Sequence, residues 1–123
     1  MMRGEVTAYR EAIVELAVAG PTGARANVRA IVDTGFTEFL SLPRALIESL
    51  ELPHLRTDEV VLADSARART DVYECVVVWD GRERVVRAYC LEGAPLLGMG
   101  LLHEHLLTIE VVEAGAVAVH PLG

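Results

Sequence analysis

Apolar and polar residues alternate along the first quarter of the chain. In segment 5–19 the regularly spaced apolar residues share one parity: Val14, Leu16 and Val18. In segment 25–33 the same spacing returns with Ala26, Val28, Ala30 and Val32. A period of two is typical of a half-buried β-strand, and residues 20–23 (Gly-Pro-Thr-Gly) have the composition of a turn. We therefore predict two strands that pair as a hairpin.

The pattern changes after residue 33. Pro43 suits the first turn of a helix, which Pro53 would stop. The helix is continued by apolar residues: Ala45, Leu46, Ile47 and Leu50. Strands are predicted over 59–63 and 70–79, with residues 64–67 as the tip between them.

A hairpin signal lies in the second half of the chain. Asp80-Gly81 is typical of a two-residue turn, so segments 70–79 and 82–91 are expected to pair. The remaining elements are expected to be short: a break at 93–95, an apolar piece at 96–98, one or two helical turns over 99–105, and a closing hairpin of 106–112 with 116–120. These patterns predict an all-β fold with one or two short helices.

The composition agrees with an ordered domain. Hydrophobic residues make up 52% and charged residues 24% of the 123 residues, which suffices for one core. No repeat or low-complexity linker divides the chain, so residues 1–123 are predicted to form a single domain. A net charge of −7 provides no basic face for nucleic acid or for an anionic membrane. The chain has no signal-peptide pattern and no apolar run of membrane-spanning length, so we expect a cytoplasmic protein.

Two cysteines, Cys75 and Cys90, can be tested against the predicted hairpin. A two-residue turn at 80–81 places Cys75 opposite Val86 and Cys90 opposite Asp71. Residues that are not cross-strand partners are poorly placed for a disulfide. We therefore expect both cysteines to be buried free thiols.

Asp33, Thr34 and Gly35 directly follow the predicted strand of segment 25–33. The strand would fix the Asp33 carboxylate at the edge of the core, Gly35 allows a sharp turn, and Thr34 can hydrogen-bond inward. Two such carboxylates about 3 Å apart share one proton, so one can activate a water molecule while the other acts as an acid. Asp-Thr-Gly is also ordinary turn chemistry, and the motif alone leaves a simple strand-ending turn open.

The surroundings of the motif suggest a family. Residues 36–43 read Phe-Thr-Glu-Phe-Leu-Ser-Leu-Pro, and residues 95–102 read Pro-Leu-Leu-Gly-Met-Gly-Leu-Leu. In this order the two motifs resemble those of the retropepsin-like aspartic proteases (clan AA), above all the small bacterial single-lobe members. In that family the Asp-Thr-Gly turn passes beside a strand of two hydrophobic residues and a glycine, which a short helix follows.

The resemblance implies a closed barrel in which Asp33 is the catalytic residue and Thr34 and Gly35 support its turn. Four residues would support the cleft: Phe36, Leu96, Leu97 and Gly98. Four others would form a flap that covers the substrate: Asp64, Ser65, Ala66 and Arg67.

The family mechanism needs two aspartates, whereas this chain has one Asp-Thr-Gly. The resemblance therefore implies a homodimer that brings two copies of Asp33 together across a twofold axis, with Thr34 of each chain clasping the partner's turn. The implied activity is that of an aspartic endopeptidase. Its substrate would be an extended peptide or protein segment paired with the flaps, and neither a metal nor an organic cofactor is needed.

Two departures from the family favour an alternative. Phe36 stands where retroviral members carry a small residue, and the flap tip 64–67 lacks the glycines of retroviral flaps. These features suit a dimerisation or peptide-binding module with little or no catalysis. A further alternative is a processing protease for one dedicated partner.

Several other polar and aromatic residues suit structural roles. His103 and His105 are two positions apart, so they converge poorly on one metal ion and are interpreted as a solvent-facing helix end. Asp64 is interpreted as a turn former. Trp79 is interpreted as a packed aromatic residue of a strand.

Overall fold

The computed structural model describes residues 1–61 and 64–123. The described residues form ten strands and two short helices: β1 (Met2–Val6), β2 (Ala12–Ala19), β3 (Arg25–Val32), β4 (Leu40–Leu42), α1 (Arg44–Ser49), β5 (His54–Val61), β6 (Arg67–Trp79), β7 (Arg82–Cys90), β8 (Leu96–Leu97), α2 (Met99–Leu102), β9 (His105–Ile109) and β10 (Ala116–Pro121). Neither helix in this part of the chain has the length and apolar character needed to cross a membrane.

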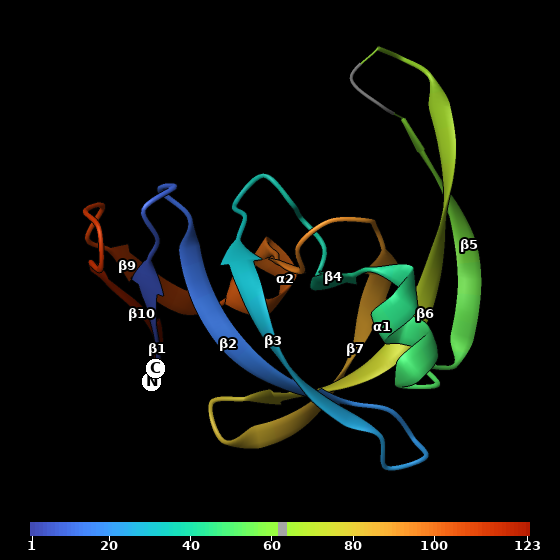
Figure 1. The fold of residues 1–123 in the computed structure, drawn as a ribbon, viewed down its shortest axis with the longest axis horizontal. Coiled ribbons are helices and arrows are strands. Elements are labelled where there is room, and N and C mark those ends of the chain that lie inside the picture. The colour runs from blue at the N-terminus through green and yellow to red at the C-terminus, as the bar shows by residue number, and fades with distance from the viewer. Residues whose placement is uncertain (62–63) are drawn as a thin grey trace.

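Six strands close into a barrel in the order β6-β7-β4-β8-β3-β2, because β2 pairs back onto β6. The pairs β3–β8 and β4–β7 are parallel and the other pairs are antiparallel, so the barrel is mixed. β5 extends the sheet beyond β6, and β1, β10 and β9 extend it beyond β2 (Figure 1). The predicted mostly β, closed barrel with one or two short helices is confirmed.

The alternating positions form the core, as predicted. Val14, Leu16 and Val18 are buried in one cluster with side chains from β4, β8 and both helices. Arg25, Asn27 and Arg29 of β3 face solvent. The helix after Pro43 is confirmed as α1, which buries Ile47 against the barrel.

The prediction of one strand over 5–19 is wrong. β1 ends at Val6 and the chain turns before β2 begins at Ala12. The hydroxyl of Thr7 accepts hydrogen bonds from the amides of Tyr9 and Glu11, and Arg10 has a φ of 62°. Local hydrogen bonding by a threonine hydroxyl thus competes with the extended conformation.

The hairpin of β5 and β6 is longer than predicted. β5 begins at His54 instead of residue 59, and β6 begins at Arg67 instead of residue 70. The hairpin stands out from the barrel (Figure 1). Because His54 to Thr57 of β5 are all exposed, this segment has no apolar parity from which a strand could be recognised.

The end of α2 also differs from the prediction. The helix ends at Leu102, and β9 begins at His105 instead of residue 106. Glu104 between them has a φ of 65°, which a helix cannot continue.

The predicted pairing across the 80–81 turn is confirmed, with Trp79 opposite Arg82 and Cys75 opposite Val86. Both cysteines are free, as expected. Cys75 is buried, and this burial raises the pKa of its thiol to about 11. Cys90 is only half-buried, in contrast to the prediction.

Candidate functional site

The strand β8 brings the two motifs together. It lies between β3 and β4, with Val32 opposite Leu97 in a parallel pair and Leu40 opposite Leu97 in an antiparallel pair. The amide of Asp33 donates a hydrogen bond to the carbonyl oxygen of Leu97 at 2.9 Å. The Asp-Thr-Gly turn and the Leu-Leu-Gly segment are therefore neighbours, although some sixty residues separate them in sequence.

The carboxylate of Asp33 is oriented by its own turn. Its Oδ1 accepts a hydrogen bond from the amide of Gly35 at 2.9 Å, and its carbonyl oxygen accepts one from the amide of Phe36 at 3.2 Å. No hydrogen bond from the described residues reaches Oδ2. Thr34 is exposed, and its role in supporting the turn stays a prediction.

Gly98 allows the loop 36–39 to pack tightly against the start of α2. A Cβ atom at Gly98 would meet the carbonyl oxygen of Glu38 and would lie 2.7 Å from the ring of Phe36. The amide of Met99 donates to the carbonyl oxygen of Phe36 at 2.8 Å. Close backbone contact that only glycine permits thus holds the loop after Asp33 in place.

Phe36 forms part of a wall. Its ring is half-buried and meets the ring of Tyr89 edge to face, with 6.2 Å between the ring centres. A hollow of about 660 Å³ lies beside this pair. Its lining comes from residues 35–38, from four residues of β5, and from Thr70, Tyr89 and Leu91. Asp33 itself does not line the hollow, but Gly35 does.

The residues predicted to form the flap lie at the end of the β5–β6 hairpin. Oδ1 of Asp64 accepts a hydrogen bond from the amide of Ala66 at 2.9 Å, as expected for a turn former. Ser65 has a φ of 66°, and Arg67, the first residue of β6, forms an ion pair with Glu59 at 2.6 Å. None of the four predicted flap residues lines the hollow. The remaining predicted strand residues at this tip, 62–63, lie outside the described part of the chain.

Asp58 and Tyr89 line the hollow, and Arg56 contacts both of them. We call these three residues the inner cluster. Arg56 donates to Oδ1 of Asp58 at 2.8 Å, and the hydroxyl of Tyr89 donates to Oδ2 at 3.0 Å. The hydrogen bond from Arg56 is the largest cause of a lowered pKa for Asp58. Burial raises the pKa of Tyr89, so this hydroxyl stays protonated and remains a donor.

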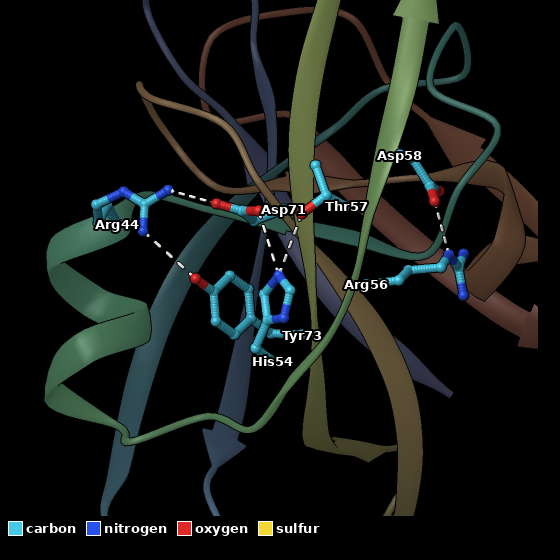
Figure 2. Close-up of polar contacts among 7 residues, drawn as sticks. All are labelled: Arg44, His54, Arg56, Thr57, Asp58, Asp71 and Tyr73. Carbon is cyan, nitrogen blue, oxygen red and sulfur yellow. Dashed lines mark hydrogen bonds and ion pairs between the residues drawn. The ribbon is translucent and has the colours of Figure 1, made fainter.

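A second polar group, the outer cluster, joins the base of the β5–β6 hairpin, which we call the flap hairpin, to α1: Arg44, His54, Thr57, Asp71 and Tyr73 (Figure 2). Asp71 is its centre, because it accepts from Thr57 at 2.7 Å and from Arg44 at 3.0 Å and contacts His54 at 3.2 Å. These three contacts, that of Thr57 first, lower the pKa of Asp71 to about 2. A register shift between His54 and Arg56 brings His54 into this group.

The outer cluster does not have the geometry of a nucleophilic triad. Thr57 and Asp71 both approach Nε2 of His54, at 3.4 and 3.2 Å. A relay requires the hydroxyl and the carboxylate to bind different ring nitrogens. The cluster instead connects the base of the β5–β6 hairpin to α1 through Arg44. Sequence reasoning missed both clusters, because their members are far apart in the chain and have no common motif.

The histidines 103 and 105 have separate surroundings. Nε2 of His105 accepts a hydrogen bond from the indole of Trp79 at 3.1 Å, and its Nδ1 lies 2.8 Å from the carbonyl oxygen of His103. Trp79 is buried in β6, as predicted. His103 is exposed, but His105 belongs to β9 and not to a helix end. Across residues 1–61 and 64–123 no group of three or more metal-ligating side chains is found.

Comparison of the chain with protein-family models, with curated proteins and with solved structures found no match.

Proposed function

We propose that the protein is an aspartic endopeptidase whose dyad consists of Asp33 from each of two copies of the chain. The observation that supports this proposal is the environment of Asp33. The carboxylate follows a strand held by β8, one of its oxygens is oriented by the amide of Gly35, and the hollow begins two residues further on. The arrangement matches what the retropepsin-like resemblance implies for a catalytic turn.

The chemistry requires the two carboxylates to share one proton. The ionised Asp33 takes a proton from a water molecule, whose oxygen attacks the carbonyl carbon of the scissile bond. The protonated Asp33 gives its proton to the carbonyl oxygen, so a neutral tetrahedral diol forms. The carboxylate that took the water proton then gives it to the amide nitrogen, while the other carboxylate takes a proton from a diol hydroxyl. The C–N bond breaks to give an amine and a carboxylic acid, and the dyad again holds one proton.

Exposed residues favour association of two copies. Thr34 and Gly35 are both exposed beside Asp33, so a twofold axis next to this turn would bring the two carboxylates together. Exposed apolar side chains near the C-terminus provide further contact area: Leu106, Ile109, Val111 and Val112. β9 is also the last strand at its end of the sheet, so it offers an edge for pairing.

The hollow and the flap suit an extended peptide. β5 is the strand at the other end of the sheet, so its outer edge can pair with a substrate backbone. The aromatic pair of Phe36 and Tyr89 offers an apolar surface for one substrate side chain.

A peptide-library digest at acid and neutral pH tests the proposal. The wild-type protein should cleave with a bell-shaped pH dependence, and Asp33→Asn should lower the rate about a thousandfold or more. Asp80→Asn is the matched control, because it makes the same chemical change in the β6–β7 turn, where the φ of 51° suits asparagine. Cleavage that persists in Asp33→Asn would remove Asp33 from the mechanism. A monomer by sedimentation at assay concentrations would contradict the shared dyad.

The second candidate is a peptide-binding module without catalysis. It is favoured by Phe36, which fills space beside the Asp33 turn, and by the glycine-free flap tip. This reading predicts that library peptides bind to the protein without being cleaved, and that Asp33→Asn leaves their affinity unchanged. Calorimetry on the same peptides distinguishes the two functions.

A further inference from the structure

Tyr89 contacts both the flap and the loop after Asp33. The residue is 6% exposed, and its backbone lies between β4 and β6, opposite Ser41 on one side and Val72 on the other. Its ring meets Phe36 edge to face. Its hydroxyl donates to Asp58 at 3.0 Å and accepts from Arg56 at 3.4 Å. Tyr89 is therefore held firmly in the barrel and joins two segments that line the hollow.

The ring contact and the hydroxyl contact each connect Tyr89 to a segment of the proposed site. Phe36 is hydrogen-bonded through its amide to the carbonyl oxygen of Asp33 at 3.2 Å, so a shift of its ring is transmitted to the turn. Asp58 and Arg56 belong to β5, the strand that forms the flap wall of the hollow. Since Arg56 and Asp58 also pair with each other at 2.8 Å, the phenol binds a charged pair, and such hydrogen bonds are the stronger ones.

We propose that Tyr89 is a positioning residue, which sets the flap strand β5 against the loop that carries Asp33. The inference rests on the proposed function for its catalytic consequence. The coupling of the two segments is a property of the chain whether or not it hydrolyses peptides. The hydroxyl of Tyr89 holds β5 through its hydrogen bonds in the inner cluster. Its ring holds the Asp33 loop through the contact with Phe36.

Tyr73 provides a matched control. It also lies on the flap hairpin, and its hydroxyl accepts a hydrogen bond from Arg44 at 3.3 Å. Its contacts belong to the outer cluster, and it does not line the hollow. Tyr73→Phe therefore removes a phenol oxygen from the flap base without removing a link to the Asp33 loop. Asp58→Asn is a second way to weaken the inner cluster and leaves Tyr89 intact.

Hydrogen exchange of backbone amides measures the coupling directly. In Tyr89→Phe we expect exchange to quicken about tenfold both in β5 at 56–59 and in the loop at 34–38. Asp58→Asn should reproduce this pattern. Tyr73→Phe should quicken exchange near α1 and in β5, but not at 34–38. If Tyr89→Phe changes β5 alone, changes neither segment, or matches Tyr73→Phe, the proposal is wrong.

Kinetics on a peptide from the library digest separates positioning from simple loss of stability. Tyr89→Phe should raise KM about tenfold with kcat nearly unchanged, because the flap is used in binding. Tyr73→Phe should keep a KM within about twofold of the wild type. A fall in kcat alone would overturn the positioning role. If the wild-type protein cleaves nothing, the proposed function fails, and the exchange pattern alone decides the coupling by Tyr89.

Discussion

The Asp33 loop and the flap hairpin are stabilised by different interactions. The loop is held by backbone hydrogen bonds to β8 and α2 and by contacts that only glycine permits. The base of the flap is held by charged and hydroxyl side chains that are largely exposed. Backbone and apolar contacts are insensitive to pH and salt, whereas exposed ion pairs are weak and screened. The comparison indicates a rigid Asp33 loop beside a hairpin, β5–β6, whose stability responds to solution conditions.

Truncation of a leucine in each region gives the largest expected contrast. Leu97 of β8 is 0% exposed, whereas Leu55 of β5 is 47% exposed. We expect Leu97→Ala to lower the free energy of unfolding by about 3 kcal/mol, because it leaves a cavity in the barrel core. Leu55→Ala should change it by about 0.5 kcal/mol or less. Urea unfolding measures both, and equal losses would contradict the comparison.

Close packing of the loop is tested by a methyl group at Gly98. Gly98→Ala should cost about 2 kcal/mol, because the methyl group collides with Phe36 and the backbone of Glu38. The control is Gly93→Ala, where nothing lies within 4 Å but φ is +103°. Backbone strain alone should cost about 1 kcal/mol there. A Gly98→Ala variant as stable as Gly93→Ala would show that the loop has room to move.

Acid should weaken the flap base through Asp71. The pKa of Asp71 is about 2 in the folded protein, below the ordinary value of 3.8. A lowered pKa stabilises the fold fully above the ordinary value, and this contribution is lost as the pH falls from about 4 towards 2. The difference in Tm between the wild type and Asp71→Asn should therefore be constant above about pH 5 and shrink below pH 4.

Glu113→Gln is the control for Asp71→Asn, since Glu113 is an exposed carboxylate in the β9–β10 turn. Its Tm difference from the wild type should stay small throughout this range. If the Tm difference between the wild type and Asp71→Asn does not shrink in acid, the charge of the Asp71 carboxylate does not stabilise the outer cluster.

Thiol reactivity is the smallest expected effect. At pH 8, about one in a thousand Cys75 thiols is ionised, given a pKa of about 11. Cys75 is also buried, whereas Cys90 is half-buried near the outer cluster. A thiol reagent should therefore modify Cys90 first and reach Cys75 only on unfolding. If the reagent modified both thiols of the native protein at the same rate, the burial of Cys75 in β6 would be contradicted.

Prediction from sequence succeeded where a signal is local. The alternation that ends at Val18 marked the buried face of β2, and Asp80-Gly81 marked the β6–β7 turn and its register. It failed where the side chains face solvent, as in β5, or where local hydrogen bonds turn the chain, as at Thr7. The neighbourhood of Asp33 and Leu97 was anticipated only through the resemblance to a family, since no periodicity links two segments so far apart.

The sequence by itself determined the buried faces of β2 and β3, the turn at 80–81 and the position of an acidic side chain directly after a strand. Local periodicity encodes these features, because each depends on a few neighbouring residues. Only the tertiary structure decided that β8 inserts between β3 and β4, that β2 closes the barrel on β6, and that Tyr89 contacts both Asp58 of β5 and Phe36. Such contacts are made between residues far apart in the chain, and their partners are selected by how the whole sheet closes.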